Sequence, residues 1–335
     1  MTFIESVLWP LTLPYGAGVH LRARAYRKGI MRQRRLGGMV ISVGNLTTGG
    51  TGKTPMVIWI AQRLLVEGKS TGILTRGYRG EGNASALTSD EVRLMQARLG
   101  DRVAFGVGAD RFAGGSELAK RGVESFVLDD GFQHLQLARD ADIVLIDAMN
   151  PFGGGHLLPA GRLREPPSAL SRADIVVITR SDHAPAIEAA VRRDSDAPIF
   201  YARAHLESIR AYSGEYPGTE SAEAYSRKLF AFGGIGNPAG FRADLREWGL
   251  DTVGYKVLPD HHRYTAQDVK AIEAETRAAG ANGIICTEKD IFNLSGISQW
   301  ELDLYYCRIS LHIARELEFW QNVLAIAESR IRSRR

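Results

Sequence analysis

The stretch SVGNLTTGGTGKTP, at positions 42–55, constrains the fold of this chain more than any other part of its 335 residues. It follows an apolar run, GGMVISVGN, and it precedes MVIWIAQRLLVEGK, in which Ile58, Leu64 and Leu65 have helical spacing. An apolar strand, a glycine-rich loop and a helix, in that order, are the setting in which a P-loop cradles phosphate groups.

The residue types of this loop suit a nucleotide phosphate. Glycines let backbone N–H groups point at an anion with no Cβ in the way, and the helix that begins after the loop adds its dipole. Thr47 stands where the usual pattern has its first glycine, so we expect Gly49 and Gly50 to take the unusual dihedrals. In this pattern the lysine reaches the β- and γ-phosphates and the following hydroxyl binds Mg²⁺. The predicted nucleotide site comprises Thr48, Gly49, Gly50, Thr51, Gly52, Lys53 and Thr54.

Further apolar runs predict a doubly wound, mostly parallel sheet of the P-loop NTPase type, with ligands at the carboxyl ends of its strands. These runs are STGILTRGY, VESFVLDDG, DADIVLIDA and RADIVVITRSD. After a Gly-, Ser- and Glu-rich stretch, a second strand–helix series begins at KLFAFGGIGNP and closes with an arginine-rich helix. We therefore predict an N-terminal segment over 1–35, a P-loop domain over 36–210, a connector over 211–227 and a smaller α/β domain over 228–335.

Two adjacent acids, Asp129 and Asp130, end the strand FVLDDG. Neighbouring carboxylates repel each other unless a cation lies between them, and a P-loop requires a carboxylate near its metal. We expect Asp129 to bind Mg²⁺ with Thr54, and Asp130 to act close to the phosphates.

The charge pattern at the amino terminus points to a membrane surface. Residues 1–19 hold one charged side chain, Glu5, among many apolar ones, whereas residues 20–35 hold seven basic side chains and no acid. This order is the reverse of a signal peptide, and Pro10, Pro14, Gly16 and Gly18 interrupt the apolar stretch. We expect the segment to lie on an anionic bilayer, although packing of its apolar residues on the domain is the alternative. The two cysteines, Cys286 and Cys307, are too few for a disulfide framework and indicate a reducing compartment.

Two other kinds of P-loop protein remain open on these residues alone. The turn Thr179-Arg180-Ser181-Asp182 is loosely like the turn by which GTP-binding proteins read guanine, which would suit a switch acting through protein contacts. ATPases with a K-G-G-x-G-K-T loop are a second possibility, but this chain has Thr48 in place of the lysine.

A further set of motifs resembles one family, the tetraacyldisaccharide 4'-kinases of lipid A biosynthesis. In chain order these motifs are VGNLTTGGTGKTP, LTRGYRG, DDGFQH, LLPAGRLREP, AFGGIGNPAGF, PDHHRYT and TEKD. The resemblance implies two α/β domains and transfer of a phosphoryl group from ATP, with Mg²⁺, to the 4'-hydroxyl of a lipid-linked glucosamine disaccharide 1-phosphate. It also implies a peripheral protein on the cytoplasmic face of the Gram-negative inner membrane. Nothing in the sequence predicts a nucleic-acid partner or an obligate protein partner.

The resemblance also implies roles for individual residues. Asp90 would be the base that takes the hydroxyl proton, held by His261, and this pairing would join the two predicted domains. Three family motifs are altered here: Ser89-Asp90-Glu91-Val92 replaces G-D-E-P, Phe152-Gly153-Gly154-Gly155 replaces F-G-N-G, and Pro159-Ala160-Gly161-Arg162 replaces P-A-G-P. Further candidates for contact with the phosphates or the lipid are Arg76, Gln133, His134, Arg164 and Lys289.

Overall fold

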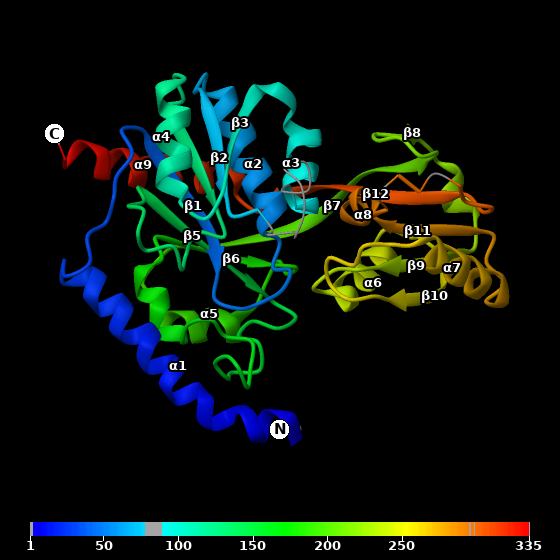
Figure 1. Ribbon diagram of the computed structural model, residues 1–335, viewed down its shortest axis with the longest axis horizontal. Coiled ribbons are helices and arrows are strands. Elements are labelled where there is room, and N and C mark those ends of the chain that lie inside the picture. Colours follow the sequence, from blue (N-terminus) through cyan, green and yellow to red (C-terminus); the bar gives the residue numbers. More distant parts are fainter. Residues whose placement is uncertain (1–2, 78–88, 295, 298, 335) are drawn as a thin grey trace. The chain divides into compact units, whose positions relative to one another are not determined.

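The computed structural model describes residues 3–77, 89–294, 296–297 and 299–334 (Figure 1). The chain forms two compact units, the first made of Met1–Arg79, Leu99–Arg203 and Leu311–Arg335, and the second of Gly80–Arg98 and Ala204–Ser310. Two strands, β7 (Ile199–Tyr212) and β12 (Leu304–Ile313), run from one unit into the other.

The first unit holds a parallel sheet in the order β3-β2-β4-β1-β5-β6-β7. Its strands are β1 (Met39–Asn45), β2 (Thr71–Thr75), β3 (Val103–Val107), β4 (Ser125–Asp129), β5 (Ala141–Asp147), β6 (Ile175–Thr179) and the start of β7. Its helices are α1 (Phe3–Arg27), α2 (Lys53–Val66), α4 (Arg111–Lys120), α5 (Pro185–Arg192) and α9 (Glu316–Arg332), with short 3₁₀ turns at Gly100–Arg102 and Pro167–Arg172.

Strand β1 lies at the centre of this sheet, between β4 and β5. Its residue Val43 is in register with Asp129 on one side and with Ile143 on the other. Because these strands are parallel, the glycine loop after β1 and the two acids ending β4 reach the same edge. The strands are buried along their whole length, as their apolar runs predict.

Helices cover the strands of the first unit. Helix α2 packs on β1, β2 and β4, and its Trp59 ring lies against the rings of Phe319 and Trp320 of α9. Helix α4 packs on β2 and β3, where Gly72 allows the close approach of Leu118.

The second unit has its own parallel strands, in the order β10-β9-β11-β12. Its elements are α3 (Asp90–Leu99), β8 (Thr219–Glu220), β9 (Leu229–Gly233), α6 (Pro238–Glu247), β10 (Thr252–Val257), α7 (Ala266–Ala278), β11 (Gly283–Thr287) and α8 (Glu288–Asn293), with a 3₁₀ turn at Glu223–Ser226. Strand β8 pairs with β7 in the antiparallel direction. Aromatic side chains such as Phe232, Tyr305 and Tyr306 fill the cores beside these strands.

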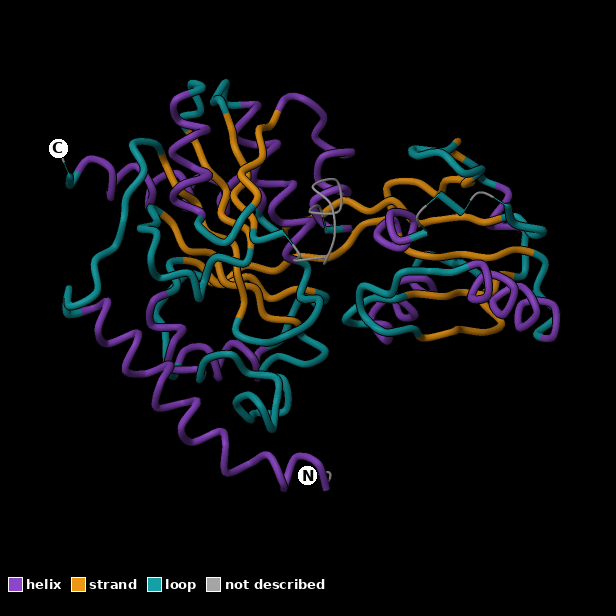
Figure 2. The backbone as a smooth tube through the Cα atoms, viewed as in Figure 1, coloured by secondary structure: helices purple, strands orange, loops and turns teal. Residues whose placement is uncertain are grey.

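Helix α1 continues without a break through Pro10 and Pro14, and Figure 2 shows it as one unbroken purple helix. Pro10, Pro14, Gly16 and Gly18 therefore interrupt the apolar stretch of the sequence without interrupting the helix. None of the helices in the described part of the chain is both long enough and apolar enough to cross a bilayer.

The two units differ from the predicted segments in three respects. Residues 89–98, which the sequence assigns to the predicted domain 36–210, belong to the second unit. The closing helix α9, assigned to the second domain, packs on β1 and β5 of the first. The predicted connector 211–227 lies entirely within the second unit and contains the end of β7 as well as β8. The reason for the second and third differences is that β7 and β12 carry the chain between the units as regular strands.

Candidate functional site

The glycine loop has the geometry of an anion site at the start of α2. Gly52 precedes the helix with φ of 88°, and Gly49 has φ of 110°. Gly49 and Gly52, rather than the predicted Gly49 and Gly50, take the left-handed conformation that a side chain disfavours. Helix α2 has no side-chain cap on its first turn, so the amides there remain available to an anion.

Hydrogen bonds with other parts of the chain hold the glycine loop in place. The Thr51 hydroxyl accepts a hydrogen bond of 3.0 Å from Asn45 Nδ2, and the Thr51 carbonyl accepts one of 3.1 Å from Thr179 Oγ1. The backbone N–H of Thr48 donates to the Arg162 carbonyl at 2.8 Å. Thr48 and Thr51, which the sequence predicts to contact the nucleotide, therefore fix the shape of the loop through these hydrogen bonds.

The two acids that end β4 have different surroundings. Asp129 is buried, and its Oδ2 accepts a hydrogen bond of 2.9 Å from Thr75 Oγ1. Asp130 has a φ of 50°, and both of its carboxylate oxygens accept from Arg164, at 2.6 and 2.8 Å. Lys53 Nζ lies 3.7 Å from the same carboxylate. Burial would raise the pKa of Asp130, but the charges of Lys53 and Arg164 outweigh it and lower that pKa.

These groups fit a nucleotide with its magnesium ion. Mg²⁺ in such sites takes one or two protein oxygens and fills its other positions with water and phosphate. The Thr54 hydroxyl, in the first turn of α2, and the Asp129 carboxylate, at the end of the neighbouring strand, supply oxygens of the right type. The described residues hold no cluster of three or more His, Cys, Asp or Glu side chains that could bind a metal without a nucleotide.

Three of the remaining candidates have different surroundings. Gln133 donates a hydrogen bond of 3.0 Å to the Asn45 carbonyl and accepts one of 3.4 Å from Arg164. Burial and nearby arginines lower the pKa of His134 to about 4, so this side chain is neutral near pH 7. Arg76 is exposed just after β2.

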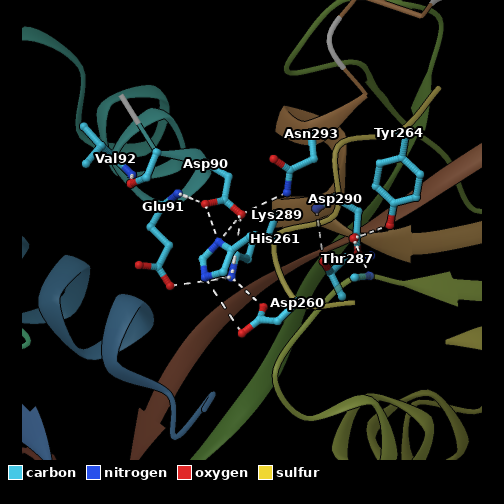
Figure 3. A network of polar contacts seen from close by, with 12 residues as sticks. Asp90, Glu91, Val92, Asp260, His261, Tyr264, Thr287, Lys289, Asp290 and Asn293 are labelled. Carbon is cyan, nitrogen blue, oxygen red and sulfur yellow. Dashed lines mark hydrogen bonds and ion pairs between the residues drawn. The ribbon is translucent and has the colours of Figure 1, made fainter. Parts of the chain in front are cut away.

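A second polar cluster lies within the other unit, around Asp90 (Figure 3). Asp90 is the first residue of α3, and its side chain is only 2% exposed. His261 Nδ1 lies 2.9 Å from one of its carboxylate oxygens and 3.0 Å from the other. Asn293 Nδ2 donates to Asp90 at 2.9 Å, and Lys289 Nζ lies 3.6 Å away.

This cluster keeps Asp90 ionised and favours a proton on His261. Burial would raise the pKa of Asp90, but the His261 hydrogen bond and the Lys289 charge lower it to about 2. The same hydrogen bond raises the pKa of His261, against the opposing effects of burial and of Lys289. Lys289 itself also lies 3.6 Å from Glu91 and 3.2 Å from Asp260, and these carboxylates raise its pKa against the effect of burial.

The residues that hold Asp90 lie after the carboxyl ends of β10 and β11, and the segment after β9 contacts them, because the His261 N–H donates to the Gly234 carbonyl at 3.1 Å. Asp290, which is completely buried, joins the segments after these three strands, and Figure 3 shows its contacts with Tyr264 and Thr287. It accepts hydrogen bonds from Gly234 N at 2.8 Å, from Tyr264 Oη at 2.6 Å and from Thr287 Oγ1 at 2.6 Å. The motifs FGGIGN, PDHHRYT and TEKD are therefore held together by hydrogen bonds to the Asp290 carboxylate.

Comparison with known proteins decides between the interpretations that the sequence left open. The family model described as tetraacyldisaccharide-1-P 4'-kinase matches residues 4–328. The chain belongs to the tetraacyldisaccharide 4'-kinase family.

Relatives in this family are similar over most of their length. The tetraacyldisaccharide 4'-kinase of Geobacter metallireducens is 41% identical over 310 residues, which cover 88% of this chain and 90% of that protein. That of Desulfotalea psychrophila is 35% identical, with coverages of 93% and 94%. The crystal structure of LpxK from Aquifex aeolicus in complex with ATP has a TM-score of 0.73 and 27% identity, and the match covers 97% of this chain and 99% of that one.

The altered family segment Ser89-Asp90-Glu91-Val92 still begins a helix in this 4'-kinase. The Val92 N–H donates to Ser89 Oγ at 3.3 Å, and the Glu91 N–H donates to Asp90 Oδ1 at 2.9 Å. These side-chain oxygens satisfy amides of the first turn, so α3 forms without the proline of the family pattern.

The expectation that the Asp90–His261 pair joins two domains is wrong for this chain, because both residues belong to the second unit. Arg98, near the end of α3, lies 2.9 Å from Glu207 and donates to the Ile309 carbonyl at 2.6 Å. These contacts anchor α3 on the strands of that unit.

Two residues near the candidate site were missed from the sequence. Asn293 ends α8 and holds Asp90, but an asparagine at a helix end is ordinarily interpreted as a cap. Arg111 begins α4 and is buried; burial lowers its pKa, and the charges of Asp129 and Asp130 oppose that effect. Its sequence signal, GADR after a strand, is too short to have been recognised alone.

Proposed function

We propose that this chain phosphorylates the 4'-hydroxyl of its lipid substrate with ATP held by the glycine loop and with Asp90 and His261 as the proton acceptor. Membership of the family makes the chain an ATP-dependent tetraacyldisaccharide 4'-kinase, acting on a precursor of lipid A. The residue assignments are the part that we propose. The observation that carries them is the double contact of His261 Nδ1 with the buried Asp90 carboxylate, at 2.9 and 3.0 Å.

On the nucleotide side, the chain's own residues neutralise and position the phosphates. The free amides at the start of α2 and the Lys53 ammonium would hold the β- and γ-phosphates, and Thr54 and Asp129 would hold Mg²⁺. The bound metal would supply charge neutralisation on the transferring group. Asp130 keeps Lys53 and Arg164 in place beside it.

On the acceptor side, the reaction requires a group that takes the proton of a weakly acidic sugar hydroxyl. A carboxylate with a pKa of about 2 binds a proton poorly on its own. The hydrogen bond to His261, whose pKa is raised, lets the pair share that proton, so we assign the role to the two residues together. Lys289 is close enough to hold an anionic oxygen of the substrate beside them.

We also propose that α1 lies on the cytoplasmic, anionic face of the inner membrane. Its side chains Val7, Leu11, Leu13 and Leu21 are each more than half exposed. The alternative, in which these apolar residues pack on the domain, does not fit that exposure. The exposed arginines that follow suit lipid phosphates, and a lipid substrate is present only at such a surface.

Transfer of labelled γ-phosphate from ATP to a tetraacyl disaccharide 1-phosphate in detergent micelles tests the assignment. We expect wild-type protein to label the lipid and Asp90→Asn to lose about 10²- to 10⁴-fold in kcat, the usual contribution of a general base. Asp101→Asn, an exposed carboxylate elsewhere in the chain, serves as the control and retains wild-type activity.

Two results would contradict the proposal in different ways. Equal labelling by wild type and Asp90→Asn would remove the proton-acceptor role while leaving the kinase. Hydrolysis of GTP in preference to ATP, with no labelled lipid, would instead favour the switch that the Thr179–Asp182 turn left open.

A further inference from the structure

The membrane-facing helix α1 has an inward face that contacts the first unit. Thr12, Tyr15, Gly16, Val19 and Tyr26 are buried or half-buried and recur at helical spacing, whereas the side chains between them are mostly exposed. The helix is therefore seated on the unit along one stripe.

The surface beneath this stripe is the long loop between β5 and the 3₁₀ turn at Pro167–Arg172. The Tyr15 hydroxyl donates a hydrogen bond of 2.9 Å to the carbonyl of Arg164. At the next residue, a Cβ added to Gly16 would lie 2.9 Å from Leu157 Cδ1. Only glycine therefore lets the helix approach Leu157 this closely without displacing the leucine side chain or the helix. Tyr15 is partly withdrawn from water, and burial and the nearby Glu165 raise its pKa.

The same loop also contacts the glycine loop through its backbone. The Arg164 N–H donates to the Leu46 carbonyl at 2.8 Å, and the Arg162 carbonyl accepts from the Thr48 N–H at 2.8 Å. Thr47 and Leu163 pair between these two bonds as an isolated antiparallel bridge. The loop thus lies between α1 and the predicted phosphate site, in contact with both.

Arg164 contacts both α1, through its backbone carbonyl, and Asp130, through its side chain. Its carbonyl is held by Tyr15, while its guanidinium binds Asp130, the carboxylate that also attracts Lys53. Lys53 and Arg164 share the Asp130 carboxylate, with Arg164 at 2.6 Å and Lys53 at 3.7 Å. Without the Arg164 contact, Asp130 would attract Lys53, the group predicted to bind phosphate, more strongly.

We propose that Tyr15 is a positioning residue that couples the seating of α1 to nucleotide binding. When the Tyr15 hydroxyl holds the Arg164 backbone, Arg164 occupies Asp130 and frees Lys53 for the phosphates. When that bond is absent, Asp130 competes with the nucleotide for Lys53. This inference rests on the proposed nucleotide site, and it adds that the membrane helix controls the affinity of that site.

The test compares Tyr15→Phe with wild type in three measurements: MgATP affinity without lipid, kcat and KM for lipid labelling, and binding to vesicles of anionic phospholipid. We expect a roughly three- to tenfold weaker MgATP affinity, the usual effect of one hydrogen bond. We expect the KM for ATP to rise by the same factor while vesicle binding and the midpoint of thermal unfolding stay at wild-type values. Tyr225→Phe, which alters an exposed tyrosine, is the control.

A second variant tests the same contact from the steric side. Gly16→Val should push α1 away from Leu157 and weaken MgATP affinity in the same way, and Leu157→Ala in the same chain should restore it. Unchanged MgATP affinity in both Tyr15→Phe and Gly16→Val would overturn the proposal. A fall in thermal stability with unchanged MgATP affinity would also overturn it, because the role would then be purely structural. If wild type binds MgATP but labels no lipid, the proposed reaction fails while the affinity measurement still decides the role of Tyr15.

Discussion

At the scale of single residues, the candidate chemistry depends on how charge is shared between neighbours. Both Asp90 oxygens already accept hydrogen bonds, one from the Glu91 N–H and one from Asn293, besides the contact with His261. A carboxylate bound in this way is fixed in orientation and remains ionised through the physiological range. Under the proposed assignment, the proton that leaves the sugar is therefore accommodated by Asp90 and His261 together.

The raised pKa of His261 predicts a pH dependence. Its hydrogen bond to Asp90 stabilises the imidazolium, so the proton is lost only above the ordinary value of about 6.5. If the deprotonated pair is the active form, kcat/KM for lipid labelling rises with pH through a limb above 6.5. In Asp90→Asn the carboxylate is gone, and we expect the residual activity to show this limb at lower pH. If kcat/KM rises over the same pH range in both proteins, the rise does not depend on the Asp90–His261 contact, and the prediction is contradicted.

The sequence predicted residues whose role follows from a local pattern. Lys53, Thr54 and Asp129 were identified because a strand, a glycine loop and a helix dictate where they lie. Asn293 could not be found in this way, because its contact with Asp90 spans more than two hundred positions and its residue type has many ordinary uses. The contact between Asp90 and His261 was suggested only by resemblance to the family.

At the scale of helices and strands, the second unit resembles the first in placing polar groups after the carboxyl ends of parallel strands. Three parallel strands, β9, β10 and β11, are followed by Gly234, His261 and Lys289; His261 and Lys289 lie close to Asp90, and Gly234 donates to Asp290. The sequence predicted a second strand–helix series here, but it missed β3 and β7. Strand β7, IFYARAHLESIRAY, mixes charged and apolar residues because much of it is only half-buried, so its pattern resembles a surface segment.

The Asp290 connection predicts how these loops are stabilised. Tyr264→Phe removes the hydroxyl that donates to Asp290 in a buried position, at little change in volume. We expect the free energy of unfolding to fall by about 1–3 kcal/mol, because a buried acceptor loses its donor. Urea unfolding followed by circular dichroism measures this change, with Tyr225→Phe as the exposed control. A loss no larger than that of the control would mean that Asp290 does not depend on Tyr264.

At the scale of the whole molecule, the chain combines two compact units with a helix that exposes apolar side chains. The crossing between the units could not be predicted, since β7 and β12 pass through it as ordinary strands. The amino-terminal charge pattern could be recognised in the sequence because it is local: apolar residues and then arginines, within one helix and the segment after it.

Membrane binding through α1 predicts a loss of vesicle affinity when its outer face becomes polar. We expect Leu11→Asn combined with Leu13→Asn to weaken binding to anionic vesicles by at least about tenfold, because each leucine would leave the bilayer interface. Leu317→Asn, on the exposed face of α9, is the matched control. Vesicle sedimentation measures the change, and equal binding by the two variants would contradict a role for α1. Neutral vesicles should bind the wild type more weakly than anionic ones, by about fivefold for each arginine engaged.

The most direct test of the central claim is a double-mutant cycle on Asp90 and His261, measured as the rate of labelled phosphate transfer from ATP to the lipid. If the two residues act as one proton acceptor, Asp90→Ala, His261→Ala and the double variant should lose kcat to a similar extent. Losses that multiply, so that the double variant falls by the product of the two single effects, would show that the residues act independently and would contradict the account.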